Sequence, residues 1–145
     1  MRRSQPKFWG STSKRRAALQ QHGYMMSRYP QFKMRGRDRS VSWTGTLEPV
    51  AGKVFTIRID YPEYGRPRVY LVDPPMADGC PHTWGRGEMC VFWPDDPENE
   101  GWETDSWVAD TIVPWSATWL YFYDHWRETG EPWAGPEKSH VGTKE

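Results

Sequence analysis

The residues Phe55–Tyr61 constrain the fold most strongly, because they alternate strictly between apolar and polar side chains. One face carries Phe55, Ile57, Ile59 and Tyr61, and the other carries Thr56, Arg58 and Asp60. A period of two is typical of an antiparallel strand with one buried face and one solvated face. The stretch therefore predicts a sheet that covers an apolar core on one side.

Three further strand-like segments surround this one, with the sequences FKMR (32–35), VSWTGTL (41–47) and RVYLV (68–72). The turns between them are rich in Gly, Pro and charged residues, at Gly36–Asp38, Glu48–Gly52 and Pro62–Pro67. Short connections of this kind join neighbouring antiparallel strands. We therefore predict a four-stranded antiparallel meander.

A helix is expected before the meander, where KRRAALQQHGYMMSRY places its apolar residues at helical spacing. Ser11 or Ser13 can cap this helix, and Pro30 ends it. Its opening turn is basic and it has a single apolar stripe, so the basic side chains of that turn are expected to face water. They are Lys14, Arg15 and Arg16.

A second helix is expected after the meander, with the sequence WSATWLYFYDHWRETG. Asp105 or Ser106 can cap a short turn through Trp107–Ala109 that precedes it. Pro114 suits the first turn of the helix, where proline is tolerated, and Gly130 ends it. Because this helix is apolar on more than one side, we expect it to pack on the sheet. The tryptophans assigned to packing are Trp43, Trp115, Trp119 and Trp126.

The length of 145 residues favours one domain, and ten tryptophans provide enough apolar surface for a core. We expect a basic flexible arm over residues 1–10, the domain over 11–130 and a tail over 131–145. No run approaches the roughly 18 uncharged apolar residues of a membrane span, and MRRSQPKFWG lacks the apolar region of a secretory signal. These features predict a cytoplasmic protein.

The formal net charge is zero, but the charges are unevenly distributed along the chain. Met1–Ser40 carries eleven Lys and Arg against one acid, whereas Val91–Asp110 carries seven acids and no base. Two interpretations stay open: both faces are simply solvated, or each steers a different macromolecular partner. The basic residues lie among Phe8, Trp9 and Tyr24, as in some nucleic-acid binders, but zero net charge and the acidic second half argue against that class.

Cys90 is the main candidate for a reactive residue. It follows the glycine-punctuated stretch PHTWGRGEM and precedes the apolar run Val91–Trp93, so its thiol can be both reachable and held in place. The alternative is a buried structural thiol, which is the commoner fate of cysteine. Two cysteines are too few for a disulfide framework, and a cytosolic setting disfavours a bridge between Cys80 and Cys90.

A metal site is a further alternative for the same cysteines. Cys80 and His82, together with Cys90 and either His125 or His140, could supply four soft ligands. Only one residue separates Cys80 from His82, whereas the usual C-x-x-C knuckle has two residues between its ligands. The sequence therefore argues against a metal site.

Taken in order, these features resemble a ubiquitin-conjugating enzyme of the bacterial type over roughly Ser11–Gly130. The ending DHWRETGEPW…PEKSH further resembles the small conjugating-enzyme-like proteins of bacterial antiphage operons, notably the short type II CBASS kind encoded beside a cGAS-like nucleotidyltransferase. The motifs that match are a YPxxxP-like turn (Tyr61, Pro62 and Pro67), an HPN-like tripeptide (His82-Thr83-Trp84), a G-x-[IM]-C setting (Gly87–Val91) and a downstream tryptophan (Trp102 or Trp107).

The resemblance implies an α+β fold of the ubiquitin-conjugating type: an N-terminal helix, the meander, an active-site loop and a C-terminal helix on the sheet. It implies that Cys90 forms a thioester with the C-terminal glycine of a ubiquitin-like protein or a cGAS-like nucleotidyltransferase, and then passes it to an amine. No cofactor is implied, and the need for an activating enzyme stays open. The alternative function is a catalytically inactive binding module of the same fold.

The resemblance also assigns roles around Cys90. Trp84 replaces the asparagine that helps the family stabilise the oxyanion, so either another donor serves, such as an N–H of the Gly85–Gly87 loop, or isopeptide formation is slower than thioester exchange. His82 is expected to be structural, through a hydrogen bond from its ring to the loop backbone. Asp95 and Asp96 are candidates to take a proton from the incoming amine and to raise the cysteine pKa.

Two partner surfaces complete the expectation. Trp84, Trp93 and Trp102 could line a channel for the extended tail of the donor protein. Lys14, Arg15 and Arg16 resemble the surface on which conjugating enzymes dock their activating enzyme, with a simple solvated face as the alternative.

Overall fold

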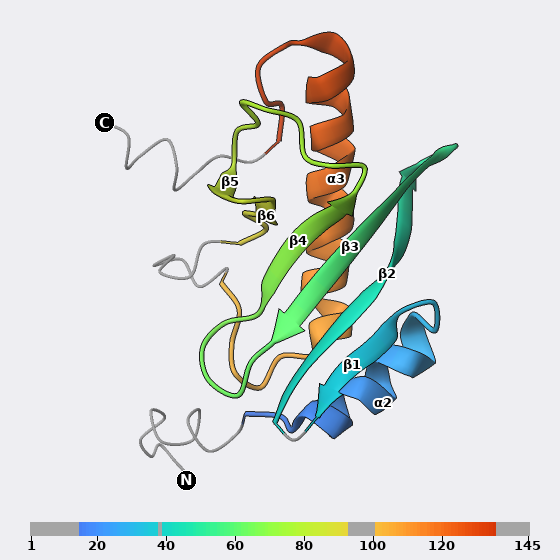
Figure 1. Cartoon of the computed structure of the whole chain (residues 1–145), viewed down its shortest axis with the longest axis vertical. Coiled ribbons are helices and arrows are strands. Elements are labelled where there is room, and N and C mark those ends of the chain that lie inside the picture. The colour runs from blue at the N-terminus through green and yellow to red at the C-terminus, as the bar shows by residue number, and fades with distance from the viewer. Residues whose placement is uncertain (1–14, 38, 93–100, 136–145) are drawn as a thin grey trace, which may run out of the picture.

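The computed structural model describes residues 15–37, 39–92 and 101–135. Six strands form one antiparallel sheet in the order β1-β2-β3-β4-β6-β5, with helices before and after it (Figure 1). In chain order the elements are α2 (Ala18–Arg28), β1 (Lys33–Arg37), β2 (Ser40–Val50), β3 (Lys53–Tyr61), β4 (Arg68–Asp73), β5 (Thr83–Gly85), β6 (Glu88–Met89), η1 (Val108–Asp110) and α3 (Ile112–Thr129).

The predicted difference between the two faces of β3 is confirmed. Phe55, Ile57, Ile59 and Tyr61 are buried, and the polar residues between them are half-buried on the opposite face. The four strands of the meander pair in sequence order, with Ile59 opposite Trp43 on β2 and opposite Val69 on β4. One face of the sheet therefore forms the floor of the core.

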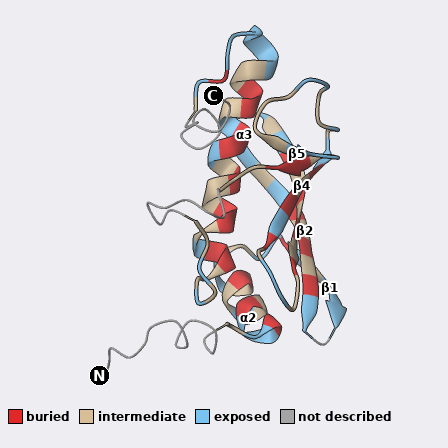
Figure 2. Cartoon of the chain, turned by 90° about the vertical axis from the view of Figure 1, so that its left-hand side faces the viewer, coloured by how far each residue is buried: buried red, intermediate tan, exposed pale blue. Residues whose placement is uncertain are grey.

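Both α-helices lie on that same face of the sheet, as the edge-on view of Figure 2 shows. On α3, Leu120 and Tyr123 are fully buried, and the Tyr123 ring meets Phe55 of β3 edge to face at a centroid distance of 6.2 Å. This arrangement confirms the predicted α+β fold of the ubiquitin-conjugating type, with the C-terminal helix packed on the sheet. The packing role of the four tryptophans is confirmed as well, since Trp43 and Trp119 are buried and Trp115 and Trp126 pack against the core.

Trp43 lies at the centre of the contact between the sheet and α2. Its indole Nε1–H donates a hydrogen bond to Nδ1 of His22 at 3.1 Å, and its ring lies 6.2 Å from that of Tyr61. Next to it, Gly45 leaves room for the Phe32 ring, because a Cβ atom at Gly45 would come within 2.6 Å of that ring. The absence of a side chain at Gly45 thus lets an aromatic ring close the core beside β1.

The start of the first helix differs from the prediction. α2 begins at Ala18, after Ala17, which forms no side-chain cap, while Ser11, Ser13 and Lys14 lie outside the described residues. Arg15 and Arg16 precede the helix and are half-buried, so the expectation that they face water from its first turn is wrong. Their guanidinium groups contact aromatic rings, and these contacts hold the entering chain against the domain.

The second helical region follows the prediction closely. η1 begins after Trp107, without a side-chain cap from Asp105 or Ser106, and Pro114 lies in the first turn of α3. Gly130 ends α3 in the left-handed conformation at φ 74°, which glycine adopts readily. Within the described residues, neither helix has the length and apolar character required to cross a membrane.

Two parts of the chain are more ordered than the sequence predicts. The long connection after Val72 contains the strands β5 and β6, which extend the sheet beyond β4. After Gly130, the described residues continue to 135, and Trp133 is only 8% exposed because it packs on Trp119. The region around Cys90 is therefore enclosed by a short hairpin and by the residues that follow α3.

Candidate active site

Cys90 directly follows the short strand β6, which fixes where its backbone lies. Met89 pairs with Val69 of β4 on one side and with Thr83 of β5 on the other, and its side chain is buried. The residues after Cys90 are held too, because the Phe92 ring packs on Trp115 of α3 at 5.7 Å. The predicted apolar anchor thus holds for the described residues Val91 and Phe92, which both pack against the core.

The hairpin turns tightly between β5 and β6. Gly85, Arg86 and Gly87 all have positive φ angles, of 95°, 58° and 81°. Glycine reaches this region without steric cost, so the G-x-G pattern was a usable signal for a hairpin. The Gly87 carbonyl accepts a hydrogen bond from the Leu71 N–H at 2.9 Å, which ties the turn to β4.

His82 holds the site through its backbone carbonyl. This oxygen accepts one hydrogen bond from the Cys90 N–H at 3.1 Å and another from the Trp119 indole Nε1–H at 2.9 Å. His82 also adopts the left-handed conformation, at φ 57°, which is uncommon for a residue other than glycine. Its imidazole ring packs on Trp133 with centroids 5.1 Å apart. The carbonyl of His82 therefore links α3 to the backbone of the cysteine.

The Cys90 thiol is half-buried, and its S–H points to the Phe92 carbonyl at 3.9 Å. Burial raises the pKa of Cys90 to about 12, while the positive charge of Arg66 opposes this rise and the negative charge of Glu88 adds to it. The sequence attributed such a rise to the acids after the cysteine, but Asp95 and Asp96 lie outside the described residues. Desolvation is the leading cause here, and the neighbouring acid precedes Cys90.

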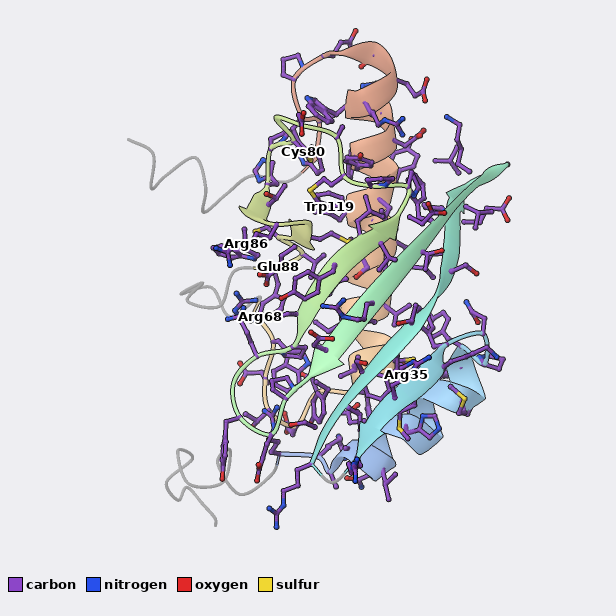
Figure 3. All side chains as sticks on the ribbon, in the orientation of Figure 1. Arg35, Arg68, Cys80, Arg86, Glu88 and Trp119 are labelled. Carbon is purple, nitrogen blue, oxygen red and sulfur yellow. The ribbon has the colours of Figure 1, made fainter. Side chains whose placement is uncertain are left out.

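A charged cluster that the sequence analysis missed lies beside the thiol. Glu88 of β6 has a side chain only 7% exposed, and its carboxylate contacts Arg66 at 3.3 Å and Arg68 at 3.8 Å. The Arg66 guanidinium also lies over the Trp84 ring, 5.1 Å from its centroid. Figure 3 shows Arg68 and Glu88 close together at the edge of the sheet where β6 lies. The available signal in the sequence was an acid, Glu88, next to apolar residues in a strand-like segment. A carboxylate that is buried there requires a cationic partner.

Three of the residues predicted to bind partners, Arg15, Arg16 and Trp102, lie in a second cluster beside the start of α2. The Arg15 Nη2–H donates to the Pro62 carbonyl at 2.6 Å, and its guanidinium lies 4.6 Å from the Tyr61 ring centroid and 5.6 Å from that of Trp102. The Arg16 guanidinium lies 3.8 Å from the Trp107 ring centroid. The structure therefore brings His82, Trp84 and Cys90 together at the hairpin, and Arg15, Arg16 and Trp102 together near the end of β3.

Within the described part of the chain, the residues considered as metal ligands do not come together in a group that could hold a metal ion. Cys80 and Cys90 are not joined in a disulfide, and burial raises the pKa of Cys80 to about 12 as well. His125 lies on α3 and its Nε2 is 3.4 Å from a carboxylate oxygen of Glu131. Other residues of the predicted site lie outside the described residues: Lys14, Trp93, Asp95, Asp96 and His140.

The chain matches a known protein family over most of its length. A family model described as type II CBASS E2 protein matches residues 21–141. The matched range includes the whole hairpin with Cys90, the Arg66 and Glu88 pair, and the residues that follow α3. A search of the curated proteins finds no match.

Proposed function

Because this chain belongs to the family of type II CBASS E2 proteins, with a role in bacterial antiphage defence, we propose that it is a cysteine acyltransferase. Cys90 accepts the C-terminal glycine of a ubiquitin-like protein or of a cGAS-like nucleotidyltransferase as a thioester. It then passes this acyl group to an amine. An activating enzyme that presents the donor as a thioester is a further proposed partner.

The observation that carries this proposal is the placement of Cys90. Its backbone is fixed by a strand before it, by the His82 carbonyl and by the packed Phe92 after it, while its side chain is only half-buried. A nucleophile must keep its position and remain accessible to the carbonyl that it attacks. A structural thiol needs neither feature.

The proposed reaction needs few groups besides the thiol. Cys90 loses its proton to solvent and attacks the carbonyl carbon of the donor thioester, so a new C–S bond forms and the donor thiolate leaves and is protonated. An amine then attacks the Cys90 thioester, a C–N bond forms, and the Cys90 thiolate leaves. We propose Asp95 and Asp96 as acceptors of the proton that the attacking amine releases.

The raised pKa of Cys90, at about 12, is compatible with this chemistry. At neutral pH the resting thiol is almost entirely protonated, which protects it from oxidation because the thiolate is the reactive form. The thioester it attacks is already activated, so only a transient thiolate is required. A raised pKa is therefore compatible with an enzyme that reacts when a donor is presented to it and stays inert otherwise.

In this proposal, the remaining site residues position Cys90 or contact the partner proteins. His82 acts through its carbonyl, and Trp84 forms part of the surface beside the thiol, 39% exposed. Trp93 and Trp102 are proposed to contact the tail of the donor. Lys14, Arg15 and Arg16 are proposed to contact the activating enzyme, in which case the contacts of Arg15 and Arg16 with aromatic rings would preset that surface.

The decisive experiment detects a covalent adduct. The purified protein is incubated with the cGAS-like nucleotidyltransferase of its own CBASS operon, an activating enzyme and ATP, and is then run on reducing and non-reducing gels. We expect an adduct that a reducing agent removes, that Cys90→Ala abolishes and that Cys80→Ala retains. Cys90→Ser should convert it into an oxyester that resists reduction. An undiminished adduct in Cys90→Ala would reject the assignment.

The alternative is a binding module of the same fold without catalysis. Trp84 favours it, since this residue lacks the amide that the resembled family uses at the tripeptide, and the protonated thiol is compatible with it. A stable complex with the nucleotidyltransferase that forms equally with Cys90→Ala, and without any adduct in the wild type, would support this function.

A further inference from the structure

We propose that the guanidinium of Arg66 supplies the N–H donors for the oxyanion that forms when Cys90 attacks a thioester. This inference rests on the proposed acyltransferase function and assigns a donor in place of the asparagine amide that is absent at Trp84. Three observations carry it: the way Arg66 is held, the donors it leaves available and its charge relation to Cys90.

Arg66 is held on two sides. It lies in the connection between β3 and β4, and its Nη1–H donates to Oε2 of Glu88 at 3.3 Å, while its Cζ lies over the Trp84 ring, 5.1 Å from the centroid. Glu88 is itself fixed, since it lies on β6 opposite Tyr70 and is almost fully buried. The carboxylate and the indole ring together restrict the position of the guanidinium. Preorganised donors of this kind stabilise a developing charge best.

Arg66 also retains unused donors. A guanidinium carries five N–H groups, and among the described residues only Glu88 accepts a hydrogen bond from that of Arg66. Its side chain remains 25% exposed, so a substrate oxygen can reach it. Glu88 therefore anchors the group, and the remaining N–H groups are available to a ligand.

Arg66 lies at the hairpin that leads into Cys90, because its two contacts, Glu88 and Trp84, come from β6 and β5. Among the described residues, the charges of Arg66 and Glu88 shift the pKa of Cys90 in opposite directions. Arg68 shares the Glu88 carboxylate at 3.8 Å but is not among the groups that act on Cys90 within the described residues. Arg66 and Arg68 are thus a matched pair, with the same side chain and the same partner but a different relation to the thiol.

In the proposed step, the Cys90 thiolate attacks the carbonyl carbon and the carbonyl π electrons move to the oxygen, which becomes an oxyanion. The N–H groups of Arg66 donate to that oxygen. The C=O bond then re-forms, and the donor thiolate leaves with its electron pair. Arg66 gives up no proton, so the same guanidinium serves the later attack by an amine.

The test compares two reactions of one thiol, in a Cys80→Ala background. The acylation probe is a synthetic glycine-ended peptide as its 2-mercaptoethanesulfonate thioester, and the alkylation probe is iodoacetamide, whose reaction forms no oxyanion. Mass spectrometry gives both rates. For Arg66→Gln we expect the ratio of acylation to alkylation to fall by about 100-fold, the usual loss for one oxyanion donor. For Arg68→Gln we expect it to stay at the wild-type value.

Each outcome decides the proposal. Equal ratios for Arg66→Gln and Arg68→Gln would overturn it, because the effect would then be general to the cluster. Should Arg66→Gln not fold, Arg66→Met keeps an unbranched stem and removes every N–H donor, and a wild-type ratio in that variant equally overturns the proposal. A wild-type protein whose Cys90 is never acylated would instead refute the acyltransferase function itself.

Discussion

The imidazole ring of His82 lies 5.1 Å from the indole ring of Trp133, so the residues after α3 contact the turn that fixes Cys90. Trp133 also packs on Trp119, whose Nε1–H donates to the His82 carbonyl. His82 is thus enclosed by two tryptophans from the C-terminal part of the chain. The predicted tail therefore contributes to the candidate site through its first residues.

Replacing Trp133 by alanine should loosen this turn. We expect the free energy of unfolding to fall by about 3–5 kcal/mol, the usual cost of truncating a buried tryptophan. Cys90 should also react faster with iodoacetamide at neutral pH, because weaker burial lowers its pKa. Urea unfolding and the alkylation rate measure the two effects. Trp126→Ala, half-buried on Tyr123, is the control that should cost stability without changing the rate.

Replacing His82 separates its backbone role from a role of its ring. Asparagine adopts the left-handed conformation readily, so His82→Asn should keep both the fold and the reducible adduct at Cys90. The β-branched His82→Val should lower the free energy of unfolding by about 1–2 kcal/mol, because its backbone resists a positive φ. Thermal unfolding and the gel assay measure both variants. A folded His82→Asn protein without adduct would show that the imidazole takes part in the reaction.

Replacing Gln21 should detach α2 from the segment that follows the active-site loop. Its side chain is buried, accepts a hydrogen bond from the Val108 N–H at 2.9 Å and donates one to the Ser106 carbonyl at 3.0 Å. Gln21→Ala leaves the buried Val108 N–H without a partner, so we expect a loss of about 2 kcal/mol or more. Gln20→Ala, an exposed neighbour on the same helix, should change the urea midpoint little. Equal midpoints for the two variants would contradict the role of Gln21.

The raised pKa values of the two cysteines predict that the free energy of unfolding falls at high pH. Both pKa values are raised to about 12 in the folded protein, against an ordinary thiol pKa near 8.5 in the unfolded chain. The folded state therefore binds these protons more tightly, and the stabilisation is complete below about pH 8.5 and is lost as pH rises toward 12. The melting temperature should fall over this range, and less steeply in the Cys80→Ala, Cys90→Ala double variant. Parallel curves would contradict burial of the thiols.

Removing the space at Gly45 tests the packing beside β1. Gly45→Ala places a Cβ atom about where the Phe32 ring lies, so the ring has to move, and we expect a destabilisation of about 1–3 kcal/mol. Gly23→Ala is the control, because a Cβ atom at Gly23 meets nothing nearby and alanine favours the helix. Urea midpoints compare the two. A Gly45→Ala protein as stable as the wild type would show that Phe32 is loosely packed.

The sequence predicted the elements whose pattern is local. The alternation in β3 and the turns around it were enough for the meander, and Pro114 and Gly130 were enough for the bounds of α3. The strands β5 and β6 were missed because segments of two or three residues show no periodicity, and β6 pairs with the edge of β4 that lies away from β3. The domain boundaries at 11 and 130 stay predictions.

The site was predicted in part for the same reason. Cys90, His82 and Trp84 lie within nine residues, so one motif contained them. Arg66 meets Glu88 across 22 residues, and Arg16 meets the Asp105 carbonyl across 89 residues. Contacts of this kind arise from strand register and chain path, which a single sequence does not reveal.

The sharing of one carboxylate by two arginines makes the edge of the hairpin tolerant of change. If either arginine is lost, Glu88 keeps a cationic neighbour, so the buried negative charge stays compensated and the strand that bears it need not unfold. A single substitution can therefore alter the charge next to the sulfur while the surrounding sheet persists.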